Sequence, residues 1–182
     1  MSHPYPDQVA RRFEEIDFKQ ALSHGRRYLC LDLDNTLLPQ RGQILEDSVI
    51  AKLQELRGSG QVSEICLISN VIFPGHRLRR LRRLAQELEI RHVVPGFFWN
   101  RKPKSAPFLQ ALGLLQAKPS QCVMVGDQIF SDIVGGNRMG FYTVWVKPIS
   151  GDHWSTTLTG RRRREQKILA QLRRQGRVDE SW

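Results

Sequence analysis

Apolar residues along the chain follow two patterns. Short unbroken apolar runs predict buried strands that begin at Tyr28 and cover 65–68, 93–94, 123–125 and 142–146. Elsewhere apolar residues return every three or four positions, which predicts helices over 6–23, 46–57, 76–89, 104–116 and 129–139. Alternating strands and helices predict an α/β fold whose mainly parallel sheet has helices on both faces.

Two of these helices carry expectations about their buried faces. In the 6–23 helix, Pro6 suits the first turn, and Val9, Phe13 and Ile16 are spaced for one apolar face. In the 104–116 helix, we expect the inward-facing residues to be Phe108, Leu109, Leu112 and Leu115.

The length of the chain, 182 residues, suits one main domain with its own hydrophobic core. We expect a Rossmann-like, doubly wound domain over 1–150, including the N-terminal helix, and a basic, helical segment over 151–182. No apolar run approaches the roughly 18 residues needed to span a bilayer, and the N-terminus has no signal-peptide core. We therefore expect a cytoplasmic protein, with peripheral membrane contact left open.

The three cysteines, Cys30, Cys66 and Cys122, each lie inside an apolar run. Their spacing does not match a metal-binding clip. This use of cysteine is typical of small buried side chains in a reducing compartment.

The charge of the chain is unusual, because 28 Lys and Arg exceed 18 Asp and Glu to give +10. Such a surface attracts anions, such as nucleic acid, anionic lipid or phosphorylated substrates. Residues 161–177 alone hold eight basic residues against one acid, beside a small apolar strip of Ile168, Leu169 and Leu172. This tail is an amphipathic helix for a membrane surface, a nucleic-acid arm or a solvated terminal helix.

Three further features have two readings each. The arginines of the 76–89 helix are a solvated face or an anion-facing surface near a functional site. The aromatic run 97–99 is more typical of core or loop anchors than of recognition elements. The apolar loop 71–75 either packs or touches lipid.

Candidate chemistry begins with Asp32 and Asp34, directly after the first strand. In a strand, residues two apart share a face, so two like charges would lie together and resist burial. A divalent cation or a shared proton would offset this repulsion. The pair also lies at the carboxyl end of its strand, which is where open α/β sheets bind ligands.

Other polar residues follow the later strands. Ser69 and Asn70 end the second strand, Lys102 precedes Pro103, and the run 123–132 reads Val-Met-Val-Gly-Asp-Gln-Ile-Phe-Ser-Asp. Together with Asp-Leu-Asp-Asn-Thr at 32–36, these resemble in order the four motifs of the haloacid dehalogenase-like phosphatases.

This resemblance implies roles for the reacting residues. Asp32 would be the nucleophile that forms an aspartyl-phosphate, and Asp34 the general acid and then base. Lys102 would contact both Asp32 and the phosphate. Ser69, with backbone N–H groups near Asn70, would bind the phosphoryl oxygens.

The same resemblance implies a Mg²⁺ cofactor. Its ligands would be Asp32, Asp127 and the main-chain carbonyl of Asp34. Asp132 would support these ligands or orient Lys102.

The motif spacing leaves no room for a cap domain. From Asp34 to Ser69 is 35 residues, and from Ser69 to Lys102 is 33, and each interval is filled by one helix, one strand and loops. An open site of this kind suits a large substrate.

The segments 31–37, 127–140, 146–149 and 163–165 are similar to the capless phosphatidylglycerophosphate phosphatase-like (YqeG-type) branch. That resemblance implies hydrolysis of phosphatidylglycerophosphate to phosphatidylglycerol at an anionic membrane. A phosphatase for a soluble sugar phosphate, nucleotide or phosphoprotein is the alternative. A non-catalytic nucleic-acid-binding protein is a third reading, which the intact motif residues disfavour.

Overall fold

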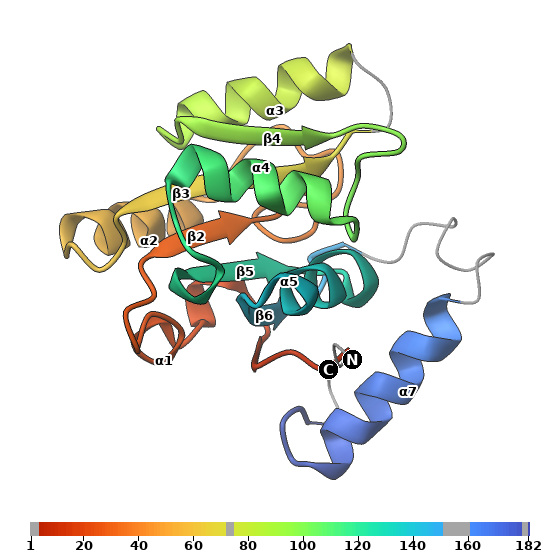
Figure 1. Ribbon diagram of the computed structural model, residues 1–182. Helices are drawn as coiled ribbons and strands as arrows, with labels where there is room; N and C mark the ends of the chain where they lie inside the picture. The colour runs from red at the N-terminus through yellow and green to blue at the C-terminus, as the bar shows by residue number, and fades with distance from the viewer. Residues whose placement is uncertain (1–3, 72–74, 151–160, 180–181) are drawn as a thin grey trace.

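The computed structural model describes residues 4–71, 75–150, 161–179 and 182. At its centre is a sheet with the strand order β1-β6-β5-β2-β3-β4, in which every neighbouring pair is parallel (Figure 1). The strands are β1 (Gln8–Ala10), β2 (Tyr28–Leu31), β3 (Glu64–Asn70), β4 (His92–Gly96), β5 (Cys122–Gly126) and β6 (Tyr142–Val146). The predicted α/β, Rossmann-like fold with a parallel sheet is confirmed.

Helices cover both faces of this sheet. They are α1 (Phe18–Ala21), α2 (Asp47–Gly58), α3 (His76–Glu87), α4 (Ser105–Leu115), α5 (Val134–Met139) and α7 (Arg161–Arg174), with short turns η1 (Phe13–Glu15), η2 (Pro119–Gln121) and η3 (Ile129–Ile133). Between β2 and β3 only α2 intervenes, and between β3 and β4 only α3, so the described residues contain no cap domain.

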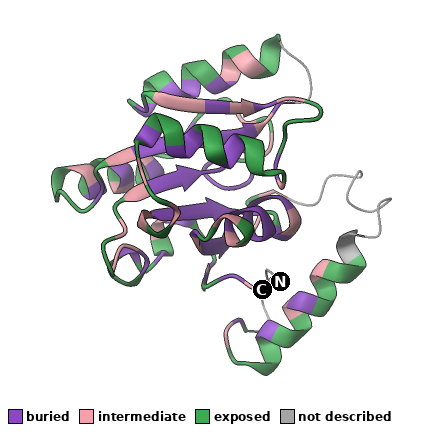
Figure 2. Cartoon of the chain, in the orientation of Figure 1, coloured by how far each residue is buried: buried purple, intermediate pink, exposed green. Residues whose placement is uncertain are grey.

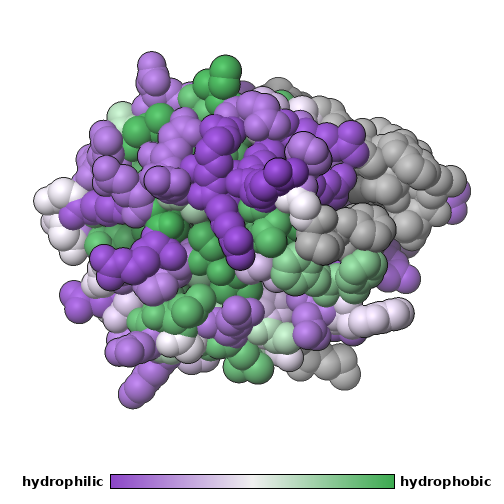
Figure 3. All heavy atoms as spheres, turned by 90° about the horizontal axis from the view of Figure 1, so that it is seen from above, coloured by the Kyte–Doolittle hydropathy of each residue, from purple (hydrophilic) through white to green (hydrophobic). Residues whose placement is uncertain are grey.

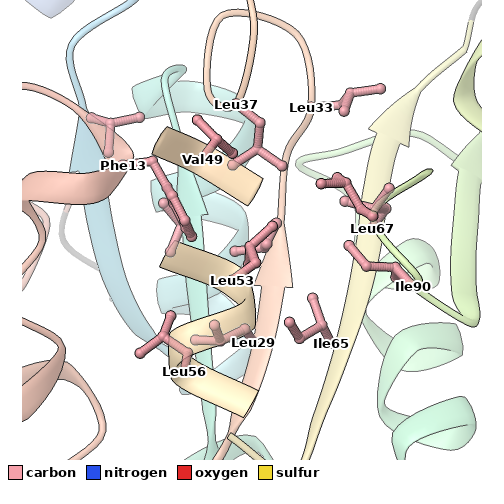
Figure 4. Close-up of a cluster of buried hydrophobic side chains, with 14 of the residues drawn as sticks. Phe13, Leu29, Leu33, Leu37, Val49, Leu53, Leu56, Ile65, Leu67 and Ile90 are labelled. Carbon is pink, nitrogen blue, oxygen red and sulfur yellow. The ribbon is translucent and has the colours of Figure 1, made fainter. Parts of the chain in front are cut away.

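The alternation of side chains along β2 builds two separate cores. Leu29 and Leu31 face one side and pack with Leu53 and other residues of α2 and α3 (Figure 4). Cys30 faces the other side and packs with Phe108 of α4. Because both faces of the central strands are covered, they read as unbroken apolar runs in the sequence (Figure 2). All three cysteines are buried and free, as their positions predicted.

The predicted helix over 6–23 is wrong. Residues Gln8–Ala10 instead form β1, followed by η1 and the short α1. Thr143 N donates to Asp7 Oδ2 at 2.7 Å, and Lys147 N donates to Ala10 O at 3.1 Å, so β1 pairs along β6. The strand satisfies backbone groups that β6 would otherwise leave at an open edge, and this long-range pairing overrides the local helical spacing.

Two smaller expectations also fail. Leu109, which was expected to face inward, is 56% exposed. Ala111 is buried on the inner face of α4 instead. β4 runs from His92 to Gly96, beyond the predicted strand at 93–94, and contains Pro95. Because β4 is the edge strand of the sheet, Pro95 needs no ladder hydrogen bond on its outer side.

Within the predicted basic segment 151–182, residues Arg161–Arg174 form α7, which packs on the domain, and residues 151–160 lie outside the described residues. Ile168 and Leu172 of its apolar strip are buried against Ile129, Ile133 and Trp145. The apolar strip therefore packs α7 onto the domain. In the part of the chain that the structure describes, no helix combines the length and apolarity needed to cross a bilayer.

The buried strip of α7 should contribute measurably to stability. We expect Leu172→Ala to lower the free energy of unfolding by about 2–5 kcal/mol, because Leu172 is fully buried. The control Leu109→Ala removes the same atoms from an exposed position and should stay within about 0.5 kcal/mol of the wild type. Urea unfolding of the full chain measures both, and equal effects would mean that α7 does not depend on this contact.

Candidate active site

The motif residues meet at the carboxyl edge of the sheet. Asp32 follows β2 and Asp127 follows β5, and these two strands are hydrogen-bonded neighbours. The chain runs from β2 outward to β3 and β4, then returns to place β5 on the other side of β2. A ligand crevice is expected where the strand order reverses in this way.

Lys102 connects three of the elements at this edge. Its Nζ lies 2.5 Å from Asp32 Oδ1 and 2.7 Å from Asp132 Oδ1, and it donates to Ile68 O at 2.5 Å. The side chain is 1% exposed, so these contacts replace the water that the ammonium loses. Burial lowers the pKa of Lys102, but the carboxylates of Asp132 and Asp32 raise it by more, so the ammonium stays charged.

Asn70 holds the main chain of Lys102 in place. Its Oδ1 accepts from Lys102 N at 2.9 Å, and its Nδ2 donates to Lys102 O at 3.2 Å. This double contact fixes the loop between β4 and α4 against the end of β3. Sequence reasoning assigned Asn70 to phosphate binding and did not find this role in positioning.

Asp132 reaches the cluster over Gly126. A Cβ at Gly126 would lie 2.4 Å from Asp132 Cγ, so only glycine permits the approach. The other carboxylate oxygen, Oδ2, accepts from Gln128 N at 3.0 Å, which fixes the side chain of Asp132 against the residue that precedes η3.

Three carboxylates form a possible cation site. Asp32, Asp127 and Asp132 each offer an oxygen within 4.8 Å of the others. Asp127 Oδ1 is buried and has no hydrogen-bond partner among the described residues. Trp145 Nε1 donates to the main-chain oxygen of Asp127 at 2.8 Å, a contact that the sequence did not suggest.

The pKa values of this cluster reflect its burial. Burial, and then the negative charges of Asp32 and Asp132, raise the pKa of Asp127 well above its usual range. Burial also raises the pKa of Asp32 to about 7, although Lys102 opposes the shift. Hard oxygen ligands with an unpartnered buried carboxylate fit a divalent cation such as Mg²⁺, which would favour the ionised forms.

Asp34 lies in the same pocket but points to a different partner. Its Oδ1 accepts from Arg41 N at 3.0 Å and lies 2.8 Å from Arg80 Nη2 of α3. The contact between Arg80 and Asp34 is an ion pair, but Arg80 Nη2 makes no aligned hydrogen bond with any described residue. A tight turn presents Asp34, since Asn35 N donates to Leu38 O at 2.8 Å with Asn35 at φ 63°. The carboxylate cluster thus contains Asp132 in place of the Asp34 side chain, and the role of the Asp34 carbonyl stays a prediction.

The site opens into a pocket of about 580 Å³. Ser69 and Lys102 lie in its wall with Asp32, and Phe98 and Trp99 line it as well. Trp99 is 81% exposed and Phe98 is 49% exposed, so these two side chains are not core residues. Phe97 alone packs against the core. Most of the apolar loop 71–75 lies outside the described residues, although Val71 is buried.

Comparison with known proteins agrees with this geometry. A HAD-hydrolase-like family model matches residues 99–174. The chain is 28% identical over 174 residues to the "Probable phosphatase YqeG" of Bacillus subtilis, covering 95% of this chain and 94% of that protein. It is 30% identical over 166 residues to a glyceraldehyde 3-phosphate phosphatase of Pyrococcus abyssi, covering 80% and 68%.

The chain belongs to the haloacid dehalogenase-like hydrolases. Its fold is similar to that of an uncharacterised Listeria monocytogenes protein, with a TM-score of 0.55 at 20% identity, over 70% of this chain and 84% of that one. The family resemblance inferred from the four motifs is confirmed, including the similarity to the YqeG-type branch.

Removing one buried carboxylate should stabilise the cation-free hydrolase. We expect Asp127→Asn to raise the melting temperature in chelator by several degrees, since about 1 kcal/mol corresponds to roughly 2–4 °C at this size. The physical reason is that the substitution removes one negative charge from a buried cluster of carboxylates. Among the described residues, Lys102 alone places an ammonium group close to this cluster.

Added Mg²⁺ should raise the melting temperature of the wild type and have a smaller effect on Asp127→Asn. Asp47→Asn at an exposed helix position is the matched control and should respond to Mg²⁺ as the wild type does. An equal response to Mg²⁺ in wild type and Asp127→Asn would remove Asp127 from the cation site.

Proposed function

We propose that the protein is a Mg²⁺-dependent phosphate monoester hydrolase that acts through an aspartyl-phosphate on Asp32. The observation that carries the proposal is the buried Asp32–Lys102–Asp132 arrangement beside Asp127, in a pocket open at the strand ends. The phosphatase names of its relatives support the reaction class.

The residues of the pocket account for each proton and bond of this reaction. A carboxylate oxygen of Asp32 forms a bond to phosphorus as the bond to the leaving alkoxide breaks. Asp34 gives the alkoxide a proton, then takes one from the water that cleaves the acyl-phosphate and regenerates Asp32. Lys102 and Ser69 lie beside Asp32 and would contact the phosphoryl oxygens. A bound Mg²⁺ would supply positive charge that lowers the repulsion between Asp32 and the anionic substrate.

Removing the nucleophile tests this assignment. Asp32→Asn keeps the shape of the side chain but cannot form the acyl-phosphate, so we expect turnover to fall by roughly 10³-fold or more. Phosphate release with Mg²⁺, compared with excess chelator, measures it, with Asp47→Asn as a surface control. Full activity in Asp32→Asn, or in chelator, would contradict the mechanism.

For the substrate, we propose phosphatidylglycerophosphate, with phosphatidylglycerol as product. An open pocket without a cap in the described residues accommodates a large molecule, and exposed Trp99 and Phe98 offer apolar surface beside the phosphate site. The extended similarity to the YqeG-type phosphatase supports this branch. The proposal places the protein in the cytoplasm, at an anionic membrane surface.

A soluble phosphate monoester is the second candidate, because the archaeal relative is named for glyceraldehyde 3-phosphate. A nucleotide or phosphoprotein belongs to the same class of alternatives. A screen of Mg²⁺-dependent phosphate release, with phosphatidylglycerophosphate in micelles against soluble sugar phosphates and nucleotides, separates these candidates. Preference for a soluble ester would overturn the lipid substrate and leave the reaction class intact.

Membrane contact through α7 is tested by removing charge, because truncation would uncover the partners of Leu172. Arg163, Arg164 and Lys167 are exposed on α7. Changing all three to Gln should weaken binding to phosphatidylglycerol vesicles by about 1 kcal/mol for each charge, less at high salt.

The matched control changes Arg27, Arg91 and Lys118 to Gln, since these exposed residues precede β2, β4 and β5 at the opposite edge of the sheet. Co-sedimentation at two salt concentrations measures both triple variants. Equal sedimentation would show that α7 is no membrane contact, and preference for RNA over vesicles at matched salt would favour the nucleic-acid partner.

A further inference from the structure

A second pocket, of about 480 Å³, adjoins the candidate active site. It lies between α3 and the loop that follows Asp34, and it shares Asp34, Gln40 and Arg77 with the first pocket. Its basic lining consists of Arg41, His76, Arg77, Arg79, Arg80 and Arg83. A single molecule bound at Asp32 can therefore extend along the shared wall into this second space. Figure 3 looks down on the α3 and β4 side of the protein, where hydrophilic residues gather.

Two of these arginines are fixed in place by the fold. Arg80 Nε donates to Gly42 O at 2.7 Å, and Arg83 Nη2 donates to Gln43 O at 2.7 Å. They fasten α3 to the loop that carries the other wall of the pocket. These contacts fix Arg80 and Arg83 in the wall of the pocket.

No carboxylate among the described residues pairs with the remaining arginines of the pocket. The side chains of Arg41, Arg77 and Arg79 make no hydrogen bond or ion pair with any residue that the structure describes. Of the described residues that line the pocket, Asp34 alone is acidic, and Arg80 already pairs with it. A concave site with this excess of positive charge concentrates anions, and guanidinium groups match phosphate geometry.

We propose that this pocket binds a second phosphate of the substrate while the scissile phosphate lies at Asp32. The inference rests on the proposed function and narrows it to monoesters that carry another phosphate a few bonds away. That second phosphate is either free, as in a bisphosphate, or esterified, as in a phospholipid headgroup. Arg79 lines only this pocket of the two, so it reports on the second phosphate alone.

The test compares substrates that differ in the second phosphate. These are 3-hydroxypropyl phosphate, 1,3-propanediol bisphosphate and phosphatidylglycerophosphate in micelles. We expect the wild type to prefer the two that carry a second phosphate, and Arg79→Gln to reduce that preference in kcat/KM by roughly tenfold. Arg82→Gln is the matched control, because Arg82 is exposed on the same helix and lies outside both pockets.

Each outcome decides the proposal. If Arg79→Gln loses the preference for both substrates that carry a second phosphate, or for only one of them, the result supports the site. The substrate affected then identifies the source of the second phosphate. An unchanged preference in Arg79→Gln, with hydrolysis intact, overturns the second site and leaves the phosphatase assignment standing.

A binding measurement keeps the two proposals separate. Calorimetric titration of full-length Asp32→Asn with 1,3-propanediol bisphosphate needs no turnover. Adding Arg79→Gln should weaken the Kd roughly tenfold, whereas adding Arg82→Gln should not. If the wild type hydrolyses no monoester but Arg79→Gln still weakens binding, the proposed reaction is wrong and the proposed anion-binding pocket is supported. An equal Kd in all three proteins overturns the pocket.

Discussion

The buried ammonium of Lys102 is the interaction on which the site depends. Without it, Asp32 and Asp132 would be like charges in a dry environment, at a high cost in free energy. Asn70 fixes the main chain of Lys102, and the absent side chain of Gly126 lets Asp132 approach. One positive charge still faces three carboxylates, and this remaining imbalance makes the edge of the sheet receptive to a cation.

The sequence predicted the frame and the meeting of the motif residues because both follow from short-range rules. Unbroken apolar runs indicated parallel strands, and polar residues directly after them lie together because parallel strands end at one edge. The contacts that hold the site were not predictable in the same way. Asn70 with Lys102, and Asp34 with Arg80, join residues far apart in the chain, and no local pattern records which side chain reaches which.

The failed expectations have the same physical origin. Residues 8–10 carry helical spacing but become β1 because β6 offers an unpaired edge. The aromatic run was expected to supply core or loop anchors, yet Trp99 is exposed and lines the pocket. For α7, sequence alone could not tell a membrane-facing strip from one that packs, and Ile129, Ile133 and Trp145 complete the strip from segments outside the tail.

The strand order also constrains how the chain can fold. β1 pairs with β6, so the first strand finds its partner only after nearly the whole domain has been made. β2 has β3 on one side early, but its other edge stays open until β5 is available. Such non-local pairing slows folding and leaves strand edges exposed in intermediates. Asp127 and Asp132 directly follow β5, so the pairing of β5 with β2 and the assembly of the charged cluster belong to one late event during synthesis.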